Sequence, residues 1–125
     1  MDKRKIMVID DEKDLLKIIK LNLESTGRYE VKVLSNAKDL LFHVHNFKPN
    51  LILLDMLMPE IGGIECCEML YNDSLGKTIP IIVLSALDKE KDKAKAYMSG
   101  VKEYLVKPVD KNQLLCKVEK VMQYK

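Results

Sequence analysis

The chain has 125 residues, of which 47% are hydrophobic and 32% charged, and a formal net charge of +2 at pH 7. This composition is typical of a globular protein and excludes intrinsic disorder, while the near balance of charges gives no argument for attraction to nucleic acid or membranes. The length predicts one domain over residues 1–125, without a linker or repeat. The charged first residues precede an apolar run of only four residues, so we expect no signal peptide, no membrane span and a cytoplasmic location.

Short apolar runs alternate along the chain with segments in which apolar residues recur at helical spacing. The expected strands are residues 5–9, 29–34, 51–55, 79–84 and 103–106. The expected helices are residues 15–23, 37–47, 64–71, 88–98 and 114–122, and the first of them ends near Gly27. Because each strand is followed by a helix, the sequence predicts an α/β fold with a five-stranded parallel sheet and helices on both faces.

The third of these strands is expected at the centre of the sheet. Four consecutive aliphatic residues, 51–54, indicate a strand that is buried on both faces. The run stops at Asp55, and Pro59 prevents the strand from continuing as a central one. Residues 29–34 instead alternate between apolar and polar types, which predicts a strand nearer the edge.

The periodicity of the helices predicts which faces pack against the sheet. We expect Ser35 or Asn36 to cap the second helix, whereas His43 and His45 lie off its apolar face and are expected in solvent rather than as ligands. The inward residues expected are Ala37, Leu40, Leu41, Val44 and Phe47 in the second helix; Ile64, Cys67 and Leu70 or Tyr71 in the third; and Ala94, Tyr97 and Met98 in the weakly amphipathic fourth.

The three cysteines indicate no redox or zinc site. Cys66 and Cys67 are adjacent, a spacing that matches neither kind of motif, and Cys116 stands alone. We expect reduced cysteines that lie partly in the core of a cytoplasmic protein.

Polar residues follow four of the five predicted strands at their carboxyl ends. They are Asp10 and Asp11, then Asp55, Ser85 and Lys107. Because the carboxyl ends of parallel strands lie along one edge, we expect these side chains to converge there. Carboxylates with room for water suit Mg²⁺, and a lysine and a hydroxyl beside them suit a phosphoryl group. Each residue alone has a simpler explanation, as a helix N-terminal acid, turn residue, cap or solvated cation.

The motifs around these residues resemble those of one family. They are VIDDE at residues 8–12, LLDMLMP at 53–59 with Gly63 following, SA at 85–86 and GVKEYLVKP at 100–108. Over about residues 5–122 the chain resembles a response-regulator receiver domain of bacterial two-component signalling, similar in layout to single-domain chemotaxis regulators. The resemblance implies a flavodoxin-like (βα)5 fold and a signalling switch, which is no enzyme beyond its own phosphotransfer and autodephosphorylation.

The resemblance also implies how the carboxylates would act. Asp55 would be the phosphoacceptor, taking a phosphoryl group from a phosphohistidine of a histidine kinase or a phosphotransfer protein. The cofactor would be Mg²⁺, bound directly by Asp11 and Asp55, by the backbone carbonyl of Leu57, and through water by Asp10.

By the same resemblance, Lys107 would pair with one phosphoryl oxygen, while Ser85 and the Ala86 N–H would donate to others. Movement of Ser85 would let Tyr104 turn inward. The surface of the fourth helix, fifth strand and fifth helix would then control a partner or an output domain missing from this chain. The Lys107–Pro108 peptide is expected to be cis, the chain to be a monomer or a phosphorylation-dependent dimer, and this domain not to contact nucleic acid.

Several positions depart from the usual family pattern. Lys102 replaces an acid that is common in the branch that dimerises, and Val101 and Val109 replace an alanine and an aromatic residue. Leu57 and Leu87 stand two residues beyond Asp55 and Ser85, where an attacking water would approach. We hypothesise that two apolar residues there slow self-dephosphorylation.

Three alternatives remain at this stage. A degenerate receiver that signals as an interaction module without phosphate would not need the full set of polar residues. A Mg²⁺-dependent phosphohydrolase of the haloacid-dehalogenase type needs an acid two residues after its nucleophile, where this chain has Leu57. A flavin or dinucleotide binder would share the fold, but the chain has no glycine-rich loop after the first strand.

Overall fold

A computed structural model describes residues 2–123 of the chain; Met1, Tyr124 and Lys125 of the predicted domain lie outside the described residues. Strands and helices alternate, as predicted. The strands are β1 (Arg4–Ile9), β2 (Tyr29–Leu34), β3 (Leu51–Asp55), β4 (Ile81–Ser85) and β5 (Glu103–Val106). The helices are α1 (Lys13–Glu24), α2 (Leu40–Phe47), α3 (Gly63–Tyr71), α4 (Glu90–Met98) and α5 (Lys111–Gln123), with a short 3-10 helix, η1 (Gly76–Thr78), before β4.

The strands form one parallel sheet in the order β2-β1-β3-β4-β5, which confirms the predicted (βα)5 α/β fold. β3 is the central strand and all five of its residues are buried. β2 is an edge strand, as its alternating sequence predicts. The buried aliphatic run therefore marks the strand around which the rest of the sheet is arranged.

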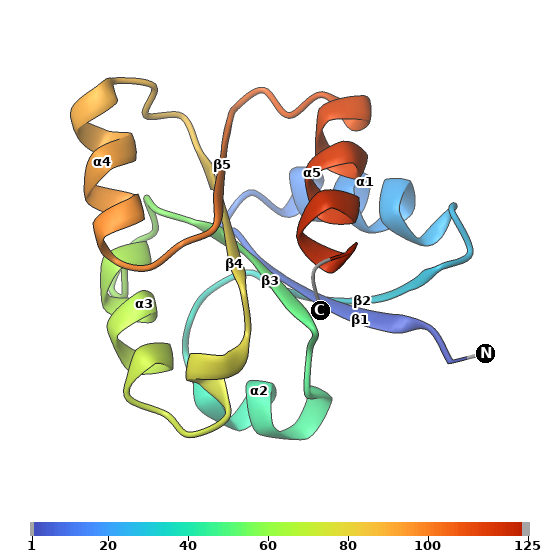
Figure 1. Ribbon diagram of the computed structural model, residues 1–125, viewed down its shortest axis with the longest axis horizontal. Coiled ribbons are helices and arrows are strands. Elements are labelled where there is room, and N and C mark those ends of the chain that lie inside the picture. Colours follow the sequence, from blue (N-terminus) through green and yellow to red (C-terminus); the bar gives the residue numbers. More distant parts are fainter. Residues whose placement is uncertain (1, 124–125) are drawn as a thin grey trace.

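Two layers of helix cover the sheet (Figure 1). α1 and α5 lie on one face, where they pack over Leu51 and Leu53. α2, α3 and α4 lie on the other, over Ile52 and Leu54. Successive residues of a strand point to opposite faces of the sheet, so alternate residues of this run pack into the two different cores. No helix within residues 2–123 has the length and apolar character needed to cross a membrane.

The start of the second helix differs from the prediction. α2 begins at Leu40, after Asp39, which has a left-handed φ of 58°. Asn36 does not cap this helix, because its Oδ1 accepts the backbone N–H of Lys38 at 2.9 Å in a local turn. Ser35 does not cap the helix either, because it lies four residues before the N-cap residue, Asp39. Asparagine favours such local turns as strongly as helix caps, which is why the sequence suggested the wrong boundary.

The inward face of α4 was also predicted wrongly. Ala96 is its buried residue, whereas Ala94 is exposed and Tyr97 and Met98 have exposed fractions of 46% and 88%. This helix has too few apolar residues to form a stripe from which its inward face could be predicted, and the small side chain of Ala96 lets its backbone approach the sheet. In α3, similarly, Cys66 joins Cys67 and Leu70 in the core, and Tyr71 is exposed.

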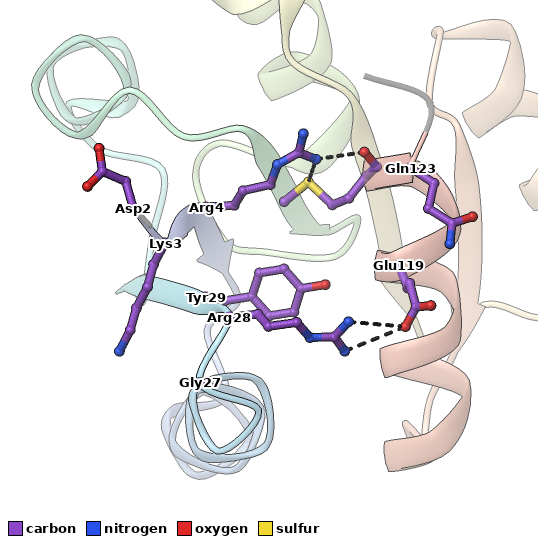
Figure 2. A pocket seen from close by; sticks show the side chains of 9 residues that line it. Asp2, Lys3, Arg4, Gly27, Arg28, Tyr29, Glu119 and Gln123 are labelled. Atoms are coloured by element: carbon purple, nitrogen blue, oxygen red, sulfur yellow. Dashed lines mark hydrogen bonds and ion pairs between the residues drawn. The ribbon is translucent and has the colours of Figure 1, made fainter.

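A pocket of about 570 Å³ lies at the amino edge of the sheet, where the end of α5 meets β1 and β2 (Figure 2). Arg4 Nη1 donates to the Met122 carbonyl at 2.6 Å. Arg28 faces Glu119 at 3.5 Å, a long and exposed pair that adds little stability. These contacts join α5 to the amino edge of the sheet. The polar residues that follow the strands lie at the opposite, carboxyl edge.

We predict that only one of the three cysteines reacts readily with a thiol reagent in the folded protein. Burial raises the pKa of Cys66 to about 12 and that of Cys67 to about 11, so neither forms thiolate at pH 8, whereas Cys116 is exposed. Titration with an aromatic disulfide reagent should count one fast thiol in buffer and three in urea. Cys116→Ser should abolish the fast phase, and a fast phase that persists in this variant would contradict the packing of α3.

Candidate functional site

Three polar residues are buried at the carboxyl ends of neighbouring strands. Tyrosines and cysteines aside, Asp10, Asp55 and Ser85 are the polar side chains that lie buried in the described part of the chain. Asp10 follows β1, Asp55 ends β3 and Ser85 ends β4. A buried carboxylate is costly unless a cation or hydrogen bonds compensate it, so this cluster needs a partner.

The register of the sheet supplies that partner from β5. Ser85 pairs with Val106, and the Lys107 N–H donates to the Ser85 carbonyl at 2.8 Å. The Lys107–Pro108 peptide that follows is cis, in agreement with the prediction. The side chain of Lys107 extends over the site, with an exposed fraction of 12%. The structure thus brings together the polar residues that the sequence placed at the ends of four strands.

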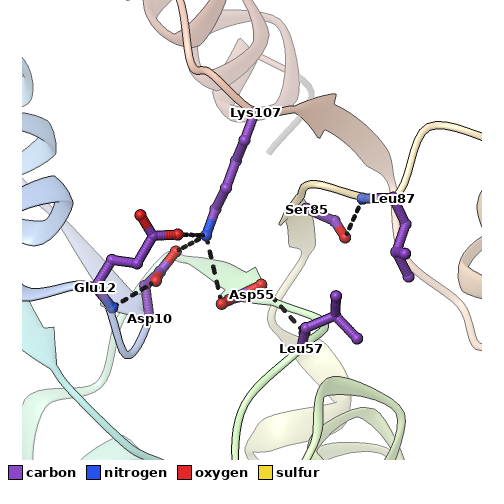
Figure 3. A network of polar contacts seen from close by, with 7 residues as sticks. All are labelled: Asp10, Glu12, Asp55, Leu57, Ser85, Leu87 and Lys107. Atoms are coloured by element: carbon purple, nitrogen blue, oxygen red, sulfur yellow. Dashed lines mark hydrogen bonds and ion pairs between the residues drawn. The ribbon is translucent and has the colours of Figure 1, made fainter.

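Three carboxylates surround the Lys107 ammonium (Figure 3). Its Nζ lies 2.9 Å from Asp10 Oδ2, 3.4 Å from Asp55 Oδ2 and 2.6 Å from Glu12 Oε1. Asp10 and Asp55 are buried, whereas the side chain of Glu12 has an exposed fraction of 60%. The ammonium therefore neutralises two buried charges and one exposed charge together.

Burial and charge change the acidity of these groups. Burial and the negative charge of Asp10 raise the pKa of Asp55 from 3.8 to about 6, against the lowering effects of the Leu57 N–H and of Lys107. Burial lowers the pKa of Lys107, but its ion pairs with Glu12 and Asp10 and the charge of Asp55 outweigh this and hold that pKa above its ordinary value. The carboxylate of Asp55 thus has a raised pKa but lies beside an ammonium that favours its ionised form.

The acidic residues can also hold a metal ion. Ligand atoms of Asp10, Asp11 and Asp55 all lie within 4.8 Å of one another, and Asp11 is exposed to water. Asp10 Oδ2 is buried and has no hydrogen bond within the described residues, although Lys107 Nζ is 2.9 Å away. Oxygen donors with access for water are what Mg²⁺ prefers, so the donor set fits this ion. The backbone of Leu57 lies beside this group of carboxylates, because its N–H donates a hydrogen bond to Asp55 Oδ1 at 3.1 Å.

Ser85 lies on the opposite side of Asp55 from Lys107 (Figure 3). Ser85 Oγ accepts the Leu87 N–H at 3.1 Å and has no hydrogen bond to Asp55. Tyr104 is already turned inward, with an exposed fraction of 8%, and its hydroxyl donates to the Leu87 carbonyl at 2.8 Å. Ala86 is exposed in the loop, between Ser85 and Leu87. Leu87 thus connects Ser85 to Tyr104 through both of its backbone polar groups.

Glu12 is the site residue to which the sequence assigned no role. It ends the acidic run of residues 10–12, and each acid in such a run before a helix has an ordinary explanation in the helix dipole. Its contact with Lys107 spans 95 positions of the chain. One feature of the sequence could have indicated the role of Glu12. Three acids follow one another at the edge of the sheet where a single lysine is also predicted.

Close packing of α3 against β3 fixes the backbone of Asp55. The Gly63 N–H donates to the Met56 carbonyl at 3.1 Å. A Cβ at Gly63 would lie 2.6 Å from Met56 Cα and 2.9 Å from the Asp55 carbonyl oxygen, closer than backbone atoms tolerate. A Cβ at Gly62 would meet only the Met56 oxygen, at an ordinary 3.7 Å. Only one of the two adjacent glycines is therefore needed for the close approach.

Comparison with known proteins gives a consistent result. The family model described as response regulator receiver domain matches residues 6–119. Protein PilG of Pseudomonas aeruginosa is 36% identical over 114 residues, which cover 91% of this chain and 84% of PilG. The alkaline phosphatase synthesis transcriptional regulatory protein PhoP of Bacillus subtilis is 33% identical over 120 residues, 96% of this chain and 49% of PhoP.

The solved receiver domain of the Francisella response regulator 1452 is 30% identical, with a TM-score of 0.88 and 98% of each chain covered. The chain spans about half the length of the first curated relatives that it matches, PhoP among them. The likeness therefore extends over this chain but over only part of several relatives.

We predict that Gly63→Ala lowers the free energy of unfolding by about 1–3 kcal/mol, the usual cost of forcing an atom into a packed site. Gly62→Ala, one residue earlier, should change it by less than about 0.5 kcal/mol. Urea unfolding followed by circular dichroism measures both. Equal effects of the two substitutions would show that the close contact with Met56 is not what requires glycine.

Proposed function

This chain belongs to the family of response regulator receiver domains, the signalling modules of two-component systems, and we propose that it works as a phosphoacceptor switch with Asp55 as the acceptor. The observation that carries the proposal is the position of Asp55, a buried carboxylate 3.4 Å from the Lys107 ammonium at the carboxyl edge of the sheet. Phosphoryl transfer depends mainly on positioning and charge neutralisation, and this arrangement supplies both.

The proposed reaction needs few protein groups. An ionised oxygen of Asp55 attacks the phosphorus of a phosphohistidine on a histidine kinase or phosphotransfer protein. The new O–P bond replaces the N–P bond, and the electron pair of that bond stays on the imidazole nitrogen of the donor. Lys107 neutralises charge on the phosphoryl oxygens as the group moves, while Ser85 and the Ala86 N–H donate to the others.

Mg²⁺ fits the same site, and Asp11, Asp55 and the Leu57 carbonyl would hold it directly, with Asp10 acting through a water molecule. The bound ion supplies further neutralisation of phosphoryl charge. Asp10 supports this assignment because its Oδ2 is buried and lacks a hydrogen bond within residues 2–123. Asp11 supports it because an exposed carboxylate leaves room for the water ligands that Mg²⁺ retains.

The switch would follow from the contacts of Ser85. A phosphoryl group on Asp55 attracts the Ser85 hydroxyl, which now accepts the Leu87 N–H at 3.1 Å. Leu87 in turn accepts the Tyr104 hydroxyl at 2.8 Å, so a shift of the loop reaches β5. α4 follows this loop and buries only Ala96 among its described residues, which makes it the least anchored helix near the site.

The output of this switch would be a changed surface over α4, β5 and α5. We propose a single receiver domain of cytoplasmic location, a monomer or a phosphorylation-dependent dimer, that acts on a partner protein or on an output domain in a longer chain. Because several relatives are transcriptional regulators twice as long, contact with DNA would belong to such a domain. The charges of this chain nearly balance, so its net charge gives no argument that the receiver itself binds nucleic acid.

The phosphate-independent interaction module is the second candidate. It would leave the charged groups gathered at the site without a purpose, since Lys107 contacts both Asp10 and Asp55 here. A phosphohydrolase is disfavoured because Leu57, where that class needs an acid, is an exposed leucine in this site.

We predict that beryllofluoride, an acyl-phosphate mimic, binds the wild-type protein in the presence of Mg²⁺. Two-dimensional NMR spectra should change at the residues near Asp55, at Ser85 and Tyr104, and along α4. Asp55→Asn should abolish these changes, because the substitution removes the oxygen that bonds to beryllium, and chelation of Mg²⁺ should reverse them. A wild-type spectrum that does not respond would favour the phosphate-independent module.

We also predict that Leu57 and Leu87 slow the loss of phosphate. Both line a pocket of about 220 Å³ together with Met56, Ile64, Asp92, Lys95 and Tyr104, and neither leucine side chain offers a polar group that could orient a water molecule near Asp55. The variant Leu57→Asn with Leu87→Glu should lose its phosphoryl group roughly tenfold faster, because polar groups there can position the attacking water. Decay of the phosphorylated protein after removal of a small phosphodonor measures this.

Leu21→Glu is the matched control, since Leu21 is an exposed leucine of α1 that does not line this pocket. Its phosphorylated form should decay at the wild-type rate. If the double variant loses phosphate no faster than the wild type, the two leucines do not control the lifetime.

A further inference from the structure

Glu12 makes the shortest of the three ion pairs of Lys107. The distance from Lys107 Nζ is 2.6 Å to Glu12, against 2.9 Å to Asp10 and 3.4 Å to Asp55. Glu12 occupies the N-cap position of α1, yet its carboxylate accepts no backbone hydrogen bond there. The side chain instead reaches across to the loop after β5 (Figure 3). The carboxylate of Glu12 is therefore not engaged in capping α1 and is available for the contact with Lys107.

The three carboxylates differ in how readily they release the lysine. Asp10 and Asp55 are buried and would be left as uncompensated charges without it. Glu12, with an exposed fraction of 60%, can exchange the ammonium for water at little cost. Of the three, Glu12 is the partner that Lys107 can give up.

The position of the ammonium matters for the proposed reaction. A lysine ammonium has three N–H donors, and three carboxylates already surround this one. Its contact with Asp55 is the longest, although a phosphoryl group on Asp55 is what Lys107 would have to reach. Lys107 is thus held on the side of the site occupied by Asp10 and Glu12.

We propose that Glu12 is a positioning residue that holds Lys107 in the unphosphorylated protein and competes with the phosphoryl group for its ammonium. The proposal rests on the proposed function, since it assumes that Asp55 is the acceptor. Phosphorylation then includes the exchange of one exposed carboxylate for a phosphoryl oxygen. Glu12 sets how strongly the site favours the free state over the phosphorylated state.

The test is the affinity for beryllofluoride at saturating Mg²⁺, measured by NMR titration of the wild type and three variants. Glu12→Gln removes the charge, and Glu12→Asp keeps the charge but shortens the side chain by one methylene, so that the 2.6 Å contact is lost. Both should bind about two- to fivefold more tightly than the wild type, the range expected for one exposed ion pair. Asp14→Asn removes a neighbouring exposed acid of α1 that has no contact with Lys107, and its affinity should equal that of the wild type.

A second readout follows the lysine itself. In protein labelled with ¹³C-lysine, the Lys107 Cε signal is identified by its loss in Lys107→Arg. Before any ligand is added, Glu12→Gln and Glu12→Asp should move this signal toward its position in the beryllofluoride complex of the wild type. A purely structural role of Glu12 would not move the signal in that direction.

The outcomes are distinct. A wild type that binds no beryllofluoride overturns the proposed function, and this proposal with it. Binding by the wild type with no gain in Glu12→Gln overturns the role of Glu12 alone. A gain in Glu12→Gln that Glu12→Asp does not share, or that Asp14→Asn does share, would trace the effect to the general charge of the site and likewise overturn the competition for Lys107.

Discussion

The pairing of Lys107 with Asp10 and Asp55 is the interaction on which the site depends. Two carboxylates buried at the ends of adjacent strands, β1 and β3, repel each other and cannot both stay ionised without a cation. Burial and Asp10 already raise the pKa of Asp55 to about 6, and the lysine opposes that rise. The ammonium therefore keeps Asp55 available as an anion at neutral pH.

The fold makes this pairing out of residues that are far apart in the sequence. Asp55 ends the central strand, and the parallel register brings β4 and then β5 beside it, so that the loop after β5 reaches back over the edge. The apolar faces of the same strands pack in both cores. Aliphatic residues within the strands pack the two cores, whereas the polar residues of the site lie at the carboxyl ends of β3 and β4 or directly after β1 and β5.

The sequence predicted the features that depend on strong local patterns. Buried aliphatic runs located the strands, and their alternation with helices predicted that the strands are parallel. Parallel strands end at one edge of the sheet, so the sequence also predicted that Asp10, Asp55, Ser85 and Lys107 lie together. It failed where one side chain has several uses. Asn36 formed a local turn rather than a cap, and α4 has too few apolar residues to show that Ala96 rather than Ala94 packs inward. The role of Glu12 depends on a partner 95 positions away, which local patterns do not reveal.

The two sides of Asp55 differ in how firmly they are held. On the side of β1 and Lys107, ion pairs to buried carboxylates fix the groups that neutralise charge. On the side of β4, Ser85 has a single hydrogen bond to the next loop, and α4 beyond it buries one alanine among its described residues. A new group on Asp55 would meet resistance on the first side and little on the second. Its effect would therefore pass through Leu87 to Tyr104 and α4, because the least anchored elements move at the lowest cost in free energy.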